Sequence, residues 1–227
     1  MKKARRIILT VVATILLLVG LALIFNEPIK GWLVQMNQDA KISKISPESI
    51  EKANKSKGDF DFSKVKSIDM AQIGKSTANN TAQTLGVLAI PGVKMRLPIL
   101  KGLSDAAMSS GGGTMRPDQK MGKGNYPLAG HYMTNKGILF SPLERTKIGQ
   151  KVYLTDLKKV YTYKIYYKKV VNPYAVWLVK NTKKKMVTLI TCANGGINRW
   201  AIRGKLVKTQ KATPKTLKIF DLEDMVK

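Results

Sequence analysis

The stretch MVTLITCANGGINRWAIRGKLV, residues 186–207, decides the fold class of this chain. Two runs of apolar and β-branched residues flank the loop ANGGIN, which is the pattern of two antiparallel strands joined by a short connection. Gly195 and Gly196 give that loop the permissive backbone it needs. In such a hairpin, Cys192 ends the first strand nearly opposite Arg199, which opens the second. The stretch therefore predicts a β-hairpin with a thiol and a guanidinium at its mouth.

Strand-like runs continue outward from this hairpin on its N-terminal side. Residues 160–171, VYTYKIYYKKVV, alternate most clearly, and residues 151–157, KVYLTDL, form a shorter run. Further upstream, GVLAIPGVKMRLPIL at residues 86–100 predicts two short strands around a Pro-Gly turn. These runs have little helix between them.

Two glycine-containing stretches lie in the middle of this region. SGGGTM, residues 110–115, predicts a flexible turn, and GKGNYPLAGHYM, residues 122–133, predicts a strand that runs into His131. With the other runs this makes seven or eight short strands. Such spacing indicates an all-β antiparallel barrel or sandwich.

The N-terminus predicts a membrane anchor. Residues 7–25, IILTVVATILLLVGLALIF, contain no charge, and as a helix they are about 28 Å long, close to the thickness of a bilayer's hydrocarbon core. Four basic residues precede them, so residues 1–6 are expected to stay cytoplasmic and the rest to be translocated. A cleaved signal peptide is the alternative, but FNEPIKGW offers no A-x-A-like cleavage site.

Residues 26–84 are polar and lysine-rich, with few strong periodic patterns. We interpret them as an extracellular stalk that carries short helices, for instance around residues 46–55 and 62–72. Asn79-Asn80 with neighbouring Ser and Thr marks a loop before the domain proper. The folded domain is therefore expected over residues 85–227.

The composition limits the partners of this chain. Among its 227 residues, 40 Lys and Arg against 14 Asp and Glu give a formal net charge of +26, so acidic ligands are expected. A domain outside the cell rarely meets nucleic acid, which leaves anionic wall polymers and lipids. A solvated face that keeps the domain soluble explains the same charge. One Cys excludes an internal disulfide, and with one His it argues against a metal cluster of these residues.

The single Cys192 has three interpretations: a buried small residue, an intermolecular bridge or a reactive nucleophile. Arg203 shares the face of Arg199 but lies roughly 13 Å further along the strand, so Arg199 is the arginine within reach of the thiol. His131 follows two small residues at another predicted strand end, although sequence does not place it beside Cys192. One Cys and one His at strand ends, with an Arg facing the Cys, together suggest a thiol acyl-transfer site.

These residues carry a resemblance to a known family. TLITC, residues 188–192, matches the TLxTC pattern of sortases, and AGH, residues 129–131, matches their catalytic-histidine segment. NRWAIRGKL, residues 198–206, looks like their arginine strand. The likeness runs from about Leu85 to Leu206, and the N-terminal anchor with an exported domain is that of class A, the housekeeping sortases.

The resemblance implies a closed eight-stranded sortase-type β-barrel with short helices, preceded by an N-terminal transmembrane helix. It implies a cysteine transpeptidase that cleaves LPXTG-type sorting signals between Thr and Gly and attaches surface proteins to an amine of lipid II, the peptidoglycan precursor. Cys192 would form the thioester, His131 would give and take protons, and Arg199 would bind the substrate backbone and stabilise the oxyanion.

Substrate contacts are expected mainly from residues 170–186, which look like the family's loop between strands six and seven. An apolar wall there would hold the Leu and Pro of the sorting signal; the alternative is that Trp177 is simply packed at a strand end. Thr191 is equally well explained as an ordinary strand threonine. The expected substrate-binding residues are Ala129, Pro173, Val176, Trp177, Leu178, Ile190 and Thr191.

Calcium is not expected as a cofactor. Some class A sortases order the substrate loop with Ca²⁺, but residues 170–186 contain no Asp or Glu here. Asp105 and Asp118 supply too few acidic oxygens for a convincing site. We therefore predict no metal and no cofactor.

Two other functions compete with transpeptidation. The same barrel could be a non-catalytic, basic module that binds the cell wall, which needs no reactive thiol. It could also be a class C-like pilin polymerase, but such enzymes usually carry an N-terminal lid and a C-terminal hydrophobic segment. The end of this chain, TPKTLKIFDLEDMVK, is a short amphipathic tail. The expected location is the cell membrane of a Gram-positive organism, single-pass, with the catalytic domain outside.

Overall fold

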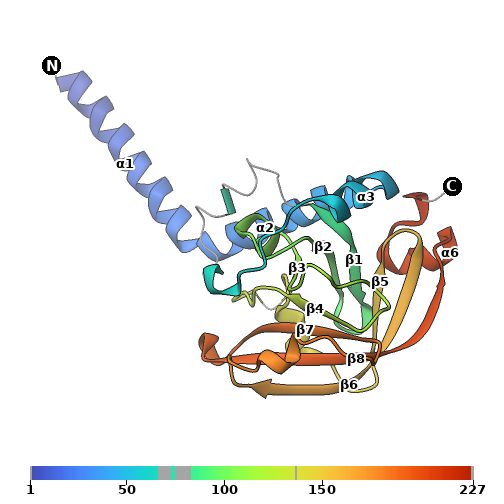
Figure 1. Ribbon diagram of the computed structural model, residues 1–227. Coiled ribbons are helices and arrows are strands. Elements are labelled where there is room, and N and C mark those ends of the chain that lie inside the picture. The colour runs from blue at the N-terminus through green and yellow to red at the C-terminus, as the bar shows by residue number, and fades with distance from the viewer. Residues whose placement is uncertain (1, 66–72, 75–82, 136, 226–227) are drawn as a thin grey trace.

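Within the residues that the structure describes, eight strands close into a barrel (Figure 1). The computed structural model describes residues 2–65, 73–74, 83–135 and 137–225. The predicted closed eight-stranded barrel is confirmed. The strands are β1 (Thr84–Ile90), β2 (Met95–Leu100), β3 (Gly112–Thr114), β4 (Asn125–Ala129), β5 (Lys151–Thr155), β6 (Lys159–Val171), β7 (Met186–Ala193) and β8 (Asn198–Lys211).

The strand order around the barrel is β1-β2-β3-β4-β7-β8-β6-β5, and β5 pairs with β1 to close it. Most neighbours are antiparallel, but β2 pairs with β3, and β4 with β7, in parallel. The expectation of a wholly antiparallel sheet is therefore wrong at these two places. Parallel neighbours need a crossover connection, which the sequence pattern of single strands does not reveal.

The glycine run at residues 110–115 is also different from its prediction, because it contains β3 and is not a free turn. A Cβ atom added at Gly113 would lie 2.4 Å from the carbonyl oxygen of Gly102, and one at Gly112 would lie 2.9 Å from the Phe140 ring. The glycines therefore allow close packing between a strand and its neighbours.

The barrel interior is apolar because alternate residues of each strand point into it. In β7, Val187 and Leu189 belong to the main core cluster, together with Leu128 of β4 and Ile202 of β8. The alternate residues of β7 therefore lie on the outer face of the barrel. This alternation decides which side chains of β4, β7 and β8 reach a substrate.

Helix α1 (Lys2–Ile24) extends away from the barrel in Figure 1. Residues 3–24 are long and apolar enough to cross a membrane, and none of the most apolar part of this helix is buried against the rest of the chain. An uncovered apolar helix of this length needs an apolar surrounding. The helix is thus a candidate membrane span by length and composition.

Residues 26–55 form two helices that contact the barrel, where a polar stalk with short helices was expected. Helix α2 (Asn26–Ser43) and helix α3 (Pro47–Lys55) lie along the β1–β2 side (Figure 1). Ile42 and Ile50 pack with Val87 of β1 and Phe220 near the C-terminus. The lysine-rich composition hid these contacts, because the buried residues of α2 form a narrow stripe.

Short helices fill the connections of the barrel. Ser46 caps α3 with a reciprocal capping box, in agreement with the helix predicted at residues 46–55. Of the helix predicted at residues 62–72, residues 62–64 form one 3₁₀ turn and residues 66–72 lie outside the described residues. Among the described residues, two further named α-helices are α5 (Asp105–Met108) and α6 (Pro214–Leu217). Further 3₁₀ turns there span Pro91–Val93, Ser141–Arg145, Val176–Leu178, Asn194–Gly196, Lys218–Phe220 and Glu223–Met225.

Candidate active site

Three neighbouring strands, β4, β7 and β8, build the candidate site on their outer faces. Since Val187 and Leu189 point into the core, Thr188, Ile190 and Cys192 of β7 point outward. Ile190 lies beside Ala129 of β4 on one side and beside Ala201 of β8 on the other. Successive outward positions on one strand are about 6.6 Å apart, so the three strands present their outer residues in rows.

The row at the end of β7 holds the predicted catalytic residues. Cys192 pairs with Arg199 across the β7–β8 hairpin, as its sequence predicts. On the other side, the Gly130 N–H donates to the Ile190 carbonyl oxygen (3.1 Å), which continues the β4–β7 ladder toward His131. His131 and Cys192 line the same two cavities. The parallel β4–β7 pair is thus what brings the imidazole to the thiol.

One of these cavities, called the apolar cavity below, has a volume of about 440 Å³. Besides His131, Cys192 and Arg199, it is lined by the small and apolar residues Ala129 and Ile190 of the next row. Its remaining apolar lining comes from Phe62, Val65, Met108 and Ile197. It is therefore an apolar groove with the thiol and one guanidinium at its end.

The second cavity, called the polar cavity below, has a volume of about 610 Å³ and is also lined by His131 and Cys192. Its lining includes Glu27 and Lys30 from the start of α2, together with Glu144 and Trp200. Lys30 forms an ion pair with Glu27 (2.9 Å). The Tyr132 hydroxyl donates to Glu144 Oε2 (2.5 Å). The two cavities share His131 and Cys192, and among the described lining residues acidic side chains occur only in the second.

The protonation of His131 follows from its surroundings. Burial lowers the pKa of His131 to about 4, and the Asp105 carboxylate offsets part of this shift. The imidazole is therefore neutral at physiological pH and can accept a proton. Cys192 is half-buried.

Arg199 reaches the site from the start of β8, directly after the exposed loop of residues 194–197. Its Nη1 donates to the carbonyl oxygens of Gly196 (2.6 Å) and Asn198 (2.9 Å). The guanidinium is thus held at the rim of the apolar cavity by the backbone of the loop that joins β7 and β8. It keeps free N–H groups in its planar fork, because five donors are available.

Of the four substrate-binding residues expected from the segment 170–186, Leu178 is the one that packs against the outer faces of β7 and β8. It is 2 % exposed and contacts the cluster of Ile190 and Ala201. Val176 is 67 % exposed and Trp177 44 % exposed. The Trp177 ring lies under the Arg203 guanidinium (5.2 Å) and edge-on to Tyr167 (6.1 Å).

Pro173, Val176 and Trp177 do not belong to the described lining of the apolar or the polar cavity. Their segment lies further along the rows, next to Leu178. Leu178 is likewise absent from the described lining of both cavities, whereas Ala129 and Ile190 line the apolar cavity.

Thr191 belongs to the lining of the apolar cavity, but little of its surface is accessible there. Alternation turns its side chain away from the outer face that carries Ile190 and Cys192, and the residue is 2 % exposed. Its hydroxyl donates to the Gly130 carbonyl oxygen (2.7 Å). Thr191 therefore connects β7 to the segment that precedes His131.

Sequence reasoning missed Phe62, Val65 and Met108 as cavity residues. Val65 packs beside Leu103, Met108 and Ala129, so a segment far upstream covers one side of the site. No short motif surrounds these residues, and only the tertiary fold brings them there. In the part of the chain that the structure describes, no group of three or more His, Cys, Asp or Glu gathers to hold a metal ion.

Known proteins were compared with this chain. A sortase-domain family profile matches residues 88–207. Sortase A of Listeria monocytogenes is 39% identical over 206 residues, 89% of this chain and 93% of that protein. Sortase A of Streptococcus agalactiae is 42% identical over 204 residues, 86% of this chain and 83% of that protein. The crystal structure of L. monocytogenes sortase A aligns with a TM-score of 0.59 at 41% identity, covering 60% of this chain and 97% of that one.

The chain belongs to the sortase family and is a cysteine transpeptidase. Its extended similarity to several sortase A proteins identifies it, within that family, as a class A sortase. The two alternatives from the sequence, a non-catalytic wall-binding module and a pilin polymerase, are not favoured. Solved class C sortases share the fold at lower identity.

Proposed function

We propose that this sortase cleaves an LPXTG-type sorting signal between Thr and Gly at Cys192 and transfers the threonyl group to an amine of lipid II. The observation that carries the proposal is that Cys192 and His131 line two cavities, and that Glu27, Lys30 and Glu144 line only the second of them. A transpeptidase needs such an arrangement, because the acyl group and the incoming amine approach one thioester from different sides.

The first half-reaction forms the thioester. The neutral imidazole of His131 accepts the Cys192 thiol proton as the sulfur attacks the threonine carbonyl carbon. The Arg199 guanidinium stabilises the oxyanion, an interaction typically worth about 3 kcal/mol of barrier. His131 then gives its proton to the departing glycine nitrogen, the C–N bond breaks, and the threonyl thioester remains on Cys192.

The second half-reaction reverses these roles. An incoming primary amine attacks the thioester carbonyl, and His131 takes the proton that the amine loses. The C–S bond breaks, the sulfur leaves as a thiolate, and the proton on His131 returns to it. No net proton is gained or lost, and one amide bond replaces another.

The sorting signal is proposed to lie extended along the rows. With its threonine carbonyl at Cys192, the residues before it reach Ala129 and Ile190, which line the apolar cavity. The Pro and Leu of the signal then lie toward Leu178, which packs on Ile190 and Ala201. Val176, Trp177 and Pro173 are proposed to contact only the far end of the signal.

The acceptor amine is proposed to enter through the polar cavity. Its Glu27 and Lys30 lie in the first turns of α2, directly after the candidate membrane span. A lipid-linked acceptor in the outer leaflet is confined to this level, so its amine and anionic groups would meet this cavity first. The basic residues in the first turns of α1 support a cytoplasmic N-terminus and an extracellular barrel. The high positive charge also suits anionic wall polymers.

The test uses the full chain in detergent micelles with an LPXTG-containing peptide and a simple glycine amine. We expect mass spectrometry to detect the glycine-containing fragment, an acyl adduct on Cys192 and the ligated product. All three should vanish in Cys192→Ala. Absence of cleavage across a set of residues at X, with Cys192 still open to alkylation, would contradict the proposed substrate.

A further inference from the structure

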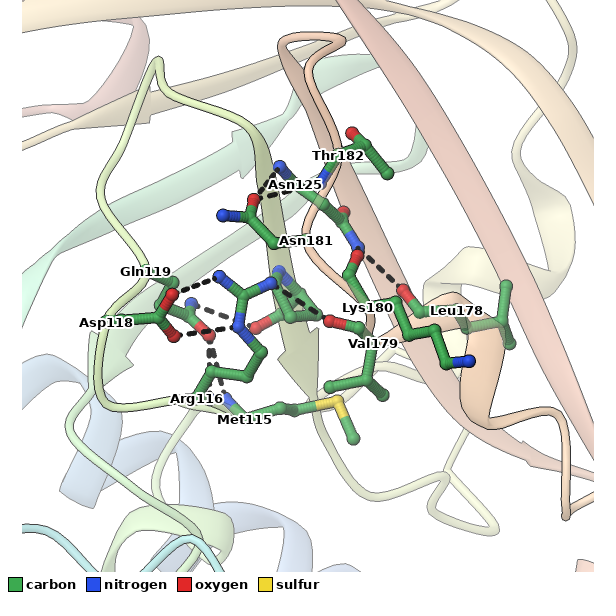
Figure 2. Close-up of polar contacts among 11 residues, drawn as sticks. Met115, Arg116, Asp118, Gln119, Asn125, Leu178, Val179, Lys180, Asn181 and Thr182 are labelled. Carbon is green, nitrogen blue, oxygen red and sulfur yellow. Dashed lines mark hydrogen bonds and ion pairs between the residues drawn. The ribbon is translucent and has the colours of Figure 1, made fainter.

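The segment before β7 is held by side chains from a distant part of the chain (Figure 2). Asn125 Nδ2 donates to the carbonyl oxygens of Leu178 (2.7 Å) and Lys180 (3.0 Å). Between them, Arg116 Nη1 donates to the Val179 carbonyl oxygen (3.0 Å). Two side chains therefore donate hydrogen bonds to three successive backbone carbonyl oxygens, which fixes both the position and the direction of this segment.

Both holding side chains are themselves fixed. Asn125 is completely buried. Arg116 forms a two-pronged ion pair with Asp118, with both contacts at 2.9 Å, so its fork has one orientation (Figure 2). Both side chains therefore lose little conformational entropy when they donate to the carbonyl oxygens.

Asn125 also joins this segment to the strand of the nucleophile. Its Oδ1 accepts a hydrogen bond from the Thr188 hydroxyl (2.7 Å), and Thr188 lies on the outer face of β7. Thr188 in turn accepts from Arg203 Nε (3.3 Å), whose guanidinium covers Trp177. One buried amide thus connects the Leu178 wall with the row that leads to Cys192.

We propose that Asn125 and Arg116 are positioning residues for the sorting signal: they hold the carbonyls of residues 178–180 so that Leu178 stands against Ile190 and Ala201 before any substrate binds. This inference rests on the proposed function. Residues 178–180 are then already ordered before the substrate binds, so binding of the sorting signal carries no entropic cost for ordering them. Loss of the hold should weaken signal binding and leave the chemistry at Cys192 intact.

The decisive variants are Asn125→Asp and Arg116→Ala. Asn125→Asp keeps the shape and the acceptor for Thr188 but turns an oxygen toward two carbonyl oxygens. Arg116→Ala removes the donor to Val179 at a partly exposed position. Arg116→Lys is the conservative variant and should recover part of the loss. The matched control is Lys183→Ala, an exposed side chain of the same segment.

The measurement is steady-state cleavage and ligation by the full chain in detergent, with peptide and amine varied separately. We expect the KM for the sorting peptide to rise about tenfold in each decisive variant, because a hydrogen bond to a held group is worth about that factor. The kcat should change less than about threefold, and the KM for the amine should stay the same. The rate of Cys192 alkylation and the melting temperature report on the fold.

An unchanged peptide KM in a folded Arg116→Ala variant overturns the inference, and this variant decides the matter if Asn125→Asp does not fold. Equal loss of kcat for both substrates with faster Cys192 alkylation also overturns it, since that would mean a purely structural role. If the unaltered chain cleaves no sorting peptide, the proposed function fails and the inference falls with it.

Discussion

The segments that enter and leave β7 are held in opposite ways. The entering segment, residues 172–185, has three of its carbonyls fixed by buried or ion-paired side chains, and Leu178 is buried beneath it. The leaving loop, residues 194–197, is exposed throughout, and a Cβ atom added at Gly195 or Gly196 would meet nothing within 4 Å. Both segments are equally close to the nucleophile strand.

This difference matches the two substrates. A wall that recognises a fixed apolar sequence gains from being pre-formed, because no ordering entropy is lost on binding. The exposed loop before Arg199 is instead tied at its Gly196 carbonyl oxygen, which accepts from Arg199 Nη1. Under the proposed function, the held segment recognises the sorting signal and the exposed loop borders the acceptor.

The largest effect on catalysis is expected for substitutions of Arg199, which follows the exposed loop of residues 194–197. Arg199→Ala should lower kcat/KM for the sorting peptide by about 100- to 1000-fold, because the oxyanion loses its charged donor. Arg199→Lys should recover little, since a single ammonium does not reproduce the fork. Peptide-cleavage kinetics measure both. A value for Arg199→Ala within tenfold of the unaltered enzyme would assign oxyanion stabilisation elsewhere.

A pair of glycine substitutions compares the two segments directly. Gly124 has φ 52°, and a Cβ atom there would lie 2.2 Å from Asn181 Oδ1, which accepts from the Asn125 N–H. Gly124→Ala should therefore raise the peptide KM several-fold and lower the melting temperature. Gly196→Ala adds only left-handed strain of about 1 kcal/mol in open space and should leave the peptide KM nearly unchanged. Equal effects of the two substitutions on the peptide KM would remove the distinction drawn above.

The pH dependence of the free energy of unfolding tests the burial of His131. Burial holds the pKa of His131 near 4, below its ordinary value of about 6.5, so the unfolded chain binds the proton more readily. Stability should thus be complete above pH 6.5 and decrease by about 2–3 kcal/mol as the pH falls toward 4. Urea unfolding at pH 7 and pH 4.5 measures this loss. In His131→Asn, the decrease in unfolding free energy between pH 7 and pH 4.5 should be smaller by the contribution of His131. An equal decrease in the variant and the unaltered protein would show that other groups cause it.

The smallest effect is expected for calcium. Because side chains already hold residues 178–180, adding Ca²⁺ to EDTA-treated enzyme should change the cleavage rate by less than about twofold. The measurement is the initial rate with and without Ca²⁺ at constant ionic strength. A severalfold increase would mean that the held segment still gains order from a cation.

The sequence contained the local part of this site. TLITC, the glycine loop and Arg199 lie in one hairpin, so period-two alternation and loop length were enough to place Cys192 opposite Arg199. The membrane-helix candidate followed from apolar length alone. These features depend on neighbours within a few residues along the chain.

The non-local part could not be predicted. His131 reaches Cys192 only through the parallel β4–β7 pair, and the holding of Leu178 depends on Asn125, whose partners are more than 50 residues away. The helices at residues 26–55 contact the barrel through a few isoleucines in a lysine-rich background. Thr191 belongs to the TLITC motif, which suggested a substrate contact, but strand alternation turns its hydroxyl toward the Gly130 carbonyl oxygen.

The parallel pairing of β4 with β7 has a consequence for how the enzyme matures. Thr191 and Gly130 are 61 residues apart along the chain, and contacts of such long range form late, since the loop between them must close first. Before that closure Cys192 is an ordinary thiol with no imidazole beside it. An unfolded chain therefore has no assembled catalytic site, and Cys192 gains its imidazole neighbour only when β4 pairs with β7.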